Sequence, residues 1–167
     1  RREVQYLVRW AARKTAAAFD DTNPLALMDM SERDGSIPGA IVNDLRHPEG
    51  THVNGNDLDI AYYQLNGDNA GRAVCNNDGW FCTSDPHLLD AERSAYFMAM
   101  LMRSDHIRVV GVDTLIAPRL EDAADDLWAL ELLDSDDISN LRRFMAYGEG
   151  WPFHHHHLHF SWSWEDG

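Results

Sequence analysis

The sequence of 167 residues is poor in positive charge, in cysteine and in long apolar runs. Fourteen Lys and Arg residues stand against 28 Asp and Glu residues, which gives a net charge of −14 with neutral histidines. Nucleic acids and anionic lipids both favour a basic protein surface, so neither is expected as a partner. No stretch approaches the roughly 18 consecutive apolar residues that mark a membrane-spanning helix, so membrane insertion is not expected either.

The two cysteines, Cys75 and Cys82, flank a turn-like segment at the end of an Asn-rich stretch, residues 66–79. A disulfide between them would tie down an exposed loop and stabilise the fold by roughly 2.5 kcal/mol in the chain-entropy model. Two free thiols in a reducing compartment are the alternative. A disulfide would place the protein in an oxidising compartment, the periplasm or the exterior of the cell.

The composition is 44 % apolar and 25 % charged, which is ordinary for one globular domain spanning residues 1–167. Residues 34–50 are rich in Gly and Pro and are predicted to form a loop that delivers His52. The apolar periodicity predicts four helices and four strands. The helices are expected at 3–19, 87–103, 119–133 and 136–146, and the strands at 25–30, 58–63, 107–116 and 158–164. Without a regular strand–helix–strand repeat, the expected class is α+β, with a small, mainly antiparallel sheet and flanking helices.

Two segments about a hundred residues apart carry the candidate chemistry. The first contains His52 and Asp59, and the second contains four consecutive histidines, 154–157, followed by His159. Alternate residues of a strand project from the same face, so His157 and His159 are expected to lie side by side. His52, Asp59 and His159 form a mixed nitrogen and oxygen donor set of the kind that holds zinc with one coordination position open.

Zinc at such a site would lower the pKa of a water ligand to roughly 7. His157 would then take the proton of that water or stabilise the tetrahedral intermediate. The two segments therefore predict a metallopeptidase with one Zn²⁺ ion. Asp57 shares a face with Asp59 and is the alternative carboxylate ligand.

Several other polar and aromatic residues have more than one possible role. His155 and His156 are expected to contact the ligand residues, to contact the substrate or to be solvated. Asp113 either orients a ligand histidine or simply ends a buried strand. The tryptophans at 162 and 164 are expected in the core, with a sugar-stacking surface as the alternative. The histidines without partners in the sequence are expected to be structural or exposed; they are His47, His87 and His106.

The pattern His-x-x-Gly-x-x-x-Asp, formed by His52, Gly55 and Asp59, resembles the first motif of the lysostaphin, D-Ala-D-Ala peptidase and hedgehog group. The His-x-His of His157 and His159 resembles its second motif. Within this group the chain is most similar to the penicillin-insensitive murein endopeptidases. The similarity includes the segments DMSERDGSIPG, GNDLDIAYY and VVGVDTLI and runs in order over nearly the whole chain.

Two positions depart from that family. Thr51 stands where the family usually has Ser, and Glu49 stands where it often has a further His. The second difference removes the residue that would serve as an accessory histidine or as a ligand of a second metal.

The resemblance implies a hedgehog/D-Ala-D-Ala peptidase-like fold with His52, Asp59 and His159 as ligands of one Zn²⁺. It implies that His157 and His154 are the catalytic or transition-state-stabilising histidines. It also implies a substrate, the peptide crosslinks of bacterial peptidoglycan, cut next to a D-amino acid in the periplasm or outside the cell. A non-catalytic, metal-stabilised binding module of the same fold and a D-Ala-D-Ala dipeptidase or carboxypeptidase are the alternative functions.

Overall fold

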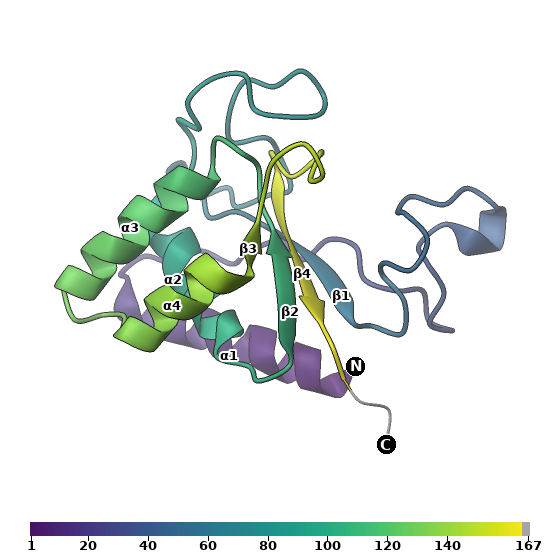
Figure 1. Cartoon of the computed structure of the whole chain (residues 1–167), viewed down its shortest axis with the longest axis horizontal. Helices are drawn as coiled ribbons and strands as arrows, with labels where there is room; N and C mark the ends of the chain where they lie inside the picture. Colours follow the sequence, from purple (N-terminus) through teal and green to yellow (C-terminus); the bar gives the residue numbers. More distant parts are fainter. Residues whose placement is uncertain (165–167) are drawn as a thin grey trace.

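A computed structural model describes residues 1–164, which contain four α-helices, one short 3₁₀ helix and one four-stranded sheet (Figure 1). The helices are α1 (Arg2–Ala18), η1 (Ala40–Val42), α2 (Ala91–Met102), α3 (Ala117–Ala129) and α4 (Ser135–Phe144). The strands are β1 (Asp57–Ala61), β2 (Ile107–Gly111), β3 (Met145–Ala146) and β4 (His157–Trp162). The expected α+β class is confirmed.

The central strands β4 and β2 organise the sheet, whose order is β1-β4-β2-β3. β4 pairs antiparallel with both β1 and β2, and β3 pairs parallel with β2. The β1–β4 register places Asp59 opposite His159 and Ala61 opposite His157. Two segments separated by about a hundred residues are thus aligned by backbone pairing alone.

The helices gather to one side of the sheet, whereas the segment that contains η1 extends away on the other side (Figure 1). α2 is the most deeply buried helix, because all nine residues from Ser94 to Met102 are buried. Its first turn is capped by the Asp90 side chain, which accepts the Arg93 backbone N–H. α4 begins with a capping box between Asp134 and Asp137. No helix among residues 1–164 is long and apolar enough to cross a membrane.

The predicted strand at 25–30 is wrong as a full strand. Leu27 forms a single bridge with Ile60, and the rest of the segment runs beside β1 without regular pairing. Its backbone still bonds to β1, since Met28 N–H donates to the Asp59 carbonyl and Asp59 N–H to the Asp29 carbonyl, each at 2.8 Å. This irregular edge brings Asp29 beside Asp59, the middle residue of β1.

The predicted strand at 107–116 ends early, at Gly111. The Asp113 carbonyl accepts the N–H groups of Ile116 and Ala117 and so turns the chain into α3. The Asp113 carboxylate accepts backbone N–H groups from Leu115 and Cys82. Asp113 is therefore a backbone anchor, and of the two predicted roles the structure supports the one at the end of the buried strand. The short strand β3 was not predicted, because two residues are too few for a periodic signal.

Cys75 and Cys82 form a disulfide, with a Cα–Cα distance of 5.7 Å. The prediction of a tied loop is confirmed. Within the loop, Asn77 and Cys82 form an isolated antiparallel bridge, so that the disulfide closes a small hairpin.

Candidate metal centre

The paired strands β1 and β4 carry half of the candidate site. Asp59 and His159 face each other across the pair, with the Asp59 Oδ1 atom 2.9 Å from His159 Nδ1. His157, two residues earlier on the same face of β4, has its Nε2 atom 3.5 Å from the same carboxylate oxygen. All three side chains are buried. The predicted pairing of His157 and His159 on one face of the final strand is confirmed.

A loop of unusual backbone conformation supplies His52. His52 has a φ of +52°, and Asn54 and Gly55 follow at +55° and +67°. Side chains with a Cβ rarely adopt this left-handed conformation. The Asp57 carboxylate fixes the turn by accepting the His52 N–H at 3.0 Å. The side chain of His52 is thereby held fully buried against the strand-borne residues.

Three donor atoms converge at this point. His52 Nε2 lies 3.1 Å from His159 Nδ1 and 3.3 Å from Asp59 Oδ1, which itself is 2.9 Å from His159 Nδ1. A tetrahedral zinc ion with bond lengths near 2.0–2.1 Å separates its ligand atoms by about 3.3 Å. Nitrogen and oxygen donors at these mutual distances could hold a metal ion.

His47 is a part of this site that the sequence prediction missed. It was expected to be structural or exposed, yet its ring stacks on that of His52 with the centroids 3.7 Å apart. His47, His52 and Asp59 each offer a ligand atom within 4.8 Å of the others, a group that could hold a metal ion. His47 Nε2 lies 3.0 Å from Asp29 Oδ2 and 3.9 Å from Asp59 Oδ2.

Asp57 lies behind the converging atoms rather than among them. One of its oxygens accepts the His52 N–H, and the other lies 3.5 Å from His159 Nε2, the nitrogen that points away from Asp59. Arg108 is close to the same oxygen, at 3.7 Å. A carboxylate in this place orients a ligand histidine and favours protonation of its outer nitrogen, which leaves Nδ1 free for a metal. Asp59, the ligand that the motif resemblance implies, is the carboxylate that faces both other donors.

The electrostatics of the cluster separate His159 from its neighbours. Burial alone would lower the pKa of His159, but hydrogen bonds and ion pairing with Asp57 and Asp59 outweigh it and raise that pKa to about 9. Burial would raise the pKa of Asp59, yet hydrogen bonds from His159 and His52 hold it far below its usual range. Without a metal, the site is thus held together by a protonated imidazole between carboxylates.

His154 and His157 are the opposite case. Burial lowers the pKa of His154 to about 4 and that of His157 well below its ordinary value. Their rings lie 4.9 Å apart, and the ring of His154 is 5.9 Å from that of His159. Both histidines are therefore neutral near pH 7, which is the state that a proton acceptor needs.

Gly111 makes room for this arrangement from the neighbouring strand. β2 places Gly111 opposite His159, and a Cβ atom at Gly111 would lie 2.4 Å from the Trp151 ring and 2.9 Å from His154 Nε2. The His154 carbonyl also accepts the Tyr62 hydroxyl at 2.9 Å. The turn before β4 is thus fitted closely to the sheet, and its histidines cannot shift without displacing buried residues.

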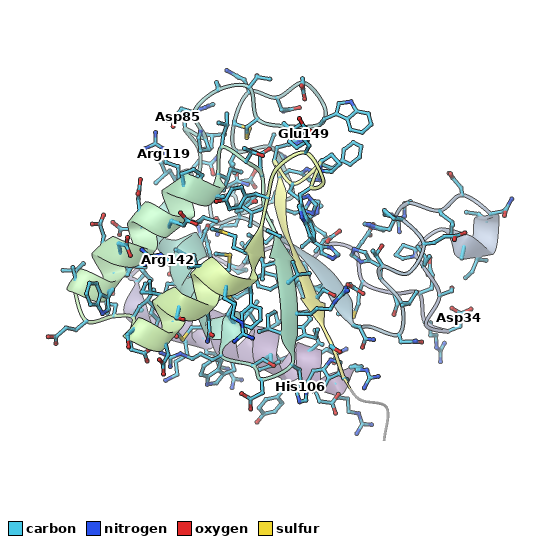
Figure 2. The ribbon with its side chains drawn as sticks, viewed as in Figure 1. Asp34, Asp85, His106, Arg119, Arg142 and Glu149 are labelled. Carbon is cyan, nitrogen blue, oxygen red and sulfur yellow. A yellow bond between two sulfur atoms is a disulfide. The ribbon has the colours of Figure 1, made fainter. Side chains whose placement is uncertain are left out.

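The cluster does not include Trp162, Trp164, His106 or His87. Trp162 is in the core, as predicted, and Trp164 stacks on His106 at 3.9 Å. Figure 2 shows His106 at the opposite end of the molecule from Glu149, which lies on the turn before β4. His87 is exposed, whereas His156 contacts His157 through ring nitrogens 3.2 Å apart. A cleft of about 870 Å³ between α3 and α4 is lined by residues such as Trp128 and contains none of the candidate site residues.

Comparison with known proteins adds no assignment: no family model, no curated protein and no solved structure matches the chain.

Proposed function

We propose that this chain is a zinc-dependent endopeptidase that hydrolyses peptide crosslinks of bacterial peptidoglycan next to a D-amino acid. The observation that carries the proposal is the convergence of His52, Asp59 and His159 with two neutral histidines beside them. A purely structural metal site uses all its ligand positions on the protein and has no need of neutral histidines nearby. The motif resemblance to the penicillin-insensitive murein endopeptidases supplies the substrate class, and the oxidised disulfide agrees with a periplasmic or secreted protein.

His52, Asp59 and His159 would hold the zinc ion, and Asp57 would orient His159. The ion when bound supplies an acidified water and polarises the scissile carbonyl. His157 accepts the proton of the attacking water, because its buried ring is neutral and its Nε2 atom lies beside Asp59 Oδ1. It then returns this proton to the departing amine, so that acid and base work are done by one group.

His154 is fixed in a single orientation by the turn that carries it. Its Nδ1 atom lies 3.1 Å from the Trp151 carbonyl, to which a protonated Nδ1 donates. This tautomer leaves a lone pair on Nε2. His154 is therefore suited to accept an N–H group of the substrate or to share a proton with His157.

The test is hydrolysis of purified crosslinked muropeptides by the zinc-loaded protein, with the products resolved by mass spectrometry. Conversion of dimers to monomers is the expected result, and treatment with a chelator should abolish it. Dimers that stay intact over a range of pH, with one zinc bound per chain, would overturn the proposal. Cleavage confined to small D-Ala-D-Ala peptides would instead identify the dipeptidase or carboxypeptidase alternative.

A further inference from the structure

The hairpin closed by Cys75 and Cys82 presents one aromatic side chain to solvent. Its tip is held by the Asp78 carboxylate, which accepts the N–H groups of Trp80 and Phe81, each at 2.8 Å. Gly79 completes the turn at a φ of +93°. These bonds hold the Trp80 backbone, while the residue remains 55 % exposed, which is unusual for the largest apolar side chain.

Trp80 stacks on a second exposed aromatic residue, Phe153. The ring centroids are 4.6 Å apart with an interplanar angle of 30°, and Phe153 is 46 % exposed. The Phe153 N–H donates to the Trp80 carbonyl at 2.7 Å. Phe153 also has a φ of +68°, a conformation that bulky residues rarely adopt. The chain therefore maintains a strained backbone at a position where the side chain gains little burial, and such strain is typical of functional sites.

The aromatic pair is continuous with the candidate metal centre. Phe153 directly precedes His154, and the base of the hairpin is tied to the same turn because Val74 N–H donates to the His155 carbonyl at 3.1 Å. On its other side, Cys82 N–H donates to the buried Asp113 carboxylate. The pair is thus tied by backbone hydrogen bonds to the turn that carries the histidine cluster.

The charges on these two segments restrict the ligand. Residues 73–92 and 144–164 contain no Lys or Arg, whereas Asp78 and Glu149 contribute carboxylates. An anionic group would find no cation on either segment. Because Phe153 lies over one face of the Trp80 ring, the opposite face is the one open to a ligand, and the flat apolar face of an uncharged sugar ring would cover it better than a methyl-sized peptide side chain.

We propose that Trp80 and Phe153 form a saccharide-binding subsite that stacks on an uncharged pyranose ring of the glycan strand next to the crosslink. The identity of the polymer rests on the proposed function, but the stacking itself requires neither metal nor hydrolysis. The subsite also gives the disulfide a role, because the covalent closure holds Trp80 in the stacking position.

The test measures binding by zinc-free protein, so that catalysis does not enter. Isothermal titration with a linear N-acetylglucosamine tetramer is compared with titration of a glycan-free crosslinked peptide. Trp80→Ala should weaken tetramer binding about ten-fold, the effect of losing an aromatic contact worth about 1.4 kcal/mol. Trp128→Ala is the matched control, because Trp128 is equally exposed, at 54 %, but lies on α3.

A second variant tests whether the disulfide holds Trp80 in the stacking position. The Cys75→Ser/Cys82→Ser protein keeps both aromatic residues and should lose affinity for the tetramer several-fold. Circular dichroism of both variants should match that of the parent protein. Tetramer binding that is absent in the parent protein, unchanged in Trp80→Ala or equally reduced in Trp128→Ala would overturn the proposal. Failure of the proposed function is a separate result, since it would appear as intact crosslinks with the tetramer still bound.

Discussion

The two halves of the candidate metal centre are built in different ways. Asp59, His157 and His159 lie on strands whose register is set by backbone pairing and whose side chains alternate between two faces. His47 and His52 lie on a loop that contains several left-handed residues, and the contacts of this loop to the sheet are made mainly by side chains. One half is specified by secondary structure, and the other by tertiary contacts.

Because of this difference, substitutions in the two halves should affect metal binding to different extents. A strand residue has neighbours that hold its backbone whether or not a metal is bound, so its substitution removes a donor and little else. A loop residue depends on the cluster for its own position, because stacking and hydrogen bonds to buried groups replace a regular ladder. The strand-borne half should therefore determine metal affinity and chemistry, and the loop-borne half should adjust to it.

Asp59→Asn should have the largest effect, because it removes the charge that faces both histidine donors and leaves a neutral amide of the same shape. Zinc affinity should fall by more than roughly 100-fold, the upper end of what loss of an outer-shell partner costs, and hydrolysis should be lost. Zinc titration against a competing chelator measures the affinity, and muropeptide cleavage measures the hydrolysis. Asp122→Asn, at an exposed position of α3, is the control. Unchanged zinc affinity would exclude Asp59 as a ligand.

The same contrast explains which parts of the site could be predicted from the sequence. The period-two alternation of β4 was sufficient to place His157 and His159 on one face, because the pattern depends only on strand geometry. His47 carried no such signal. Its position depends on the 34–50 loop folding back onto β1 and on Asp29, which lies on an irregular edge rather than in the strand predicted there.

Prediction of the helices from the sequence was limited in a similar way. All four were predicted within a few residues, because each has a continuous apolar stripe. The point where β2 gives way to α3 was missed, since it is set by hydrogen bonds to the Asp113 carbonyl and carboxylate rather than by apolar periodicity. Trp80 and Phe153 were also not identified, because their pairing requires the hairpin and the turn before β4 to meet in space.

His157→Ala should separate chemistry from metal binding within the strand-borne half. Turnover should fall by roughly 10²–10⁴-fold, the usual contribution of a general base, while zinc affinity stays within a few-fold of the parent value. His87→Ala, at an exposed position, should retain both properties. A protein that acts only as a binding module would bind peptidoglycan equally well with either substitution and cleave it with neither.

Zinc affinity should depend on pH through His159. In the zinc-free protein its pKa is raised to about 9, so the Nδ1 proton must leave before the metal can bind. Affinity should therefore rise about ten-fold per pH unit from pH 7 to 9, or about 100-fold in all, and level off above pH 9. Titrations at pH 7.5 in buffers of different ionisation enthalpy should show release of about one proton from this group. A zinc affinity that does not change over this pH range would mean that the metal displaces no proton from His159.

Asp57→Asn tests the orienting role of the carboxylate behind His159. Zinc affinity should fall roughly 10–100-fold, as is typical when an outer-shell carboxylate is lost. The pKa of His159 in the zinc-free protein should also fall, because one of the two carboxylates that raise it is gone. NMR titration of the His159 ring would detect this change. A loss of affinity without a change in that pKa would assign Asp57 to the His52 turn alone, through the His52 N–H bond.

His47→Ala should have the smallest effect and gives the sharpest test of the comparison. His47 Nε2 already contacts Asp29 and lies 3.9 Å from Asp59 Oδ2, whereas His159 Nδ1 lies 2.9 Å from Asp59 Oδ1. Loss of His47 should therefore weaken zinc binding less than ten-fold, within the range of an outer-shell contact, while His159→Ala should approach the effect of Asp59→Asn. The reverse order would make His47, His52 and Asp59 the ligand set. The loop and β1 would then supply the metal ligands, and β4 would supply none.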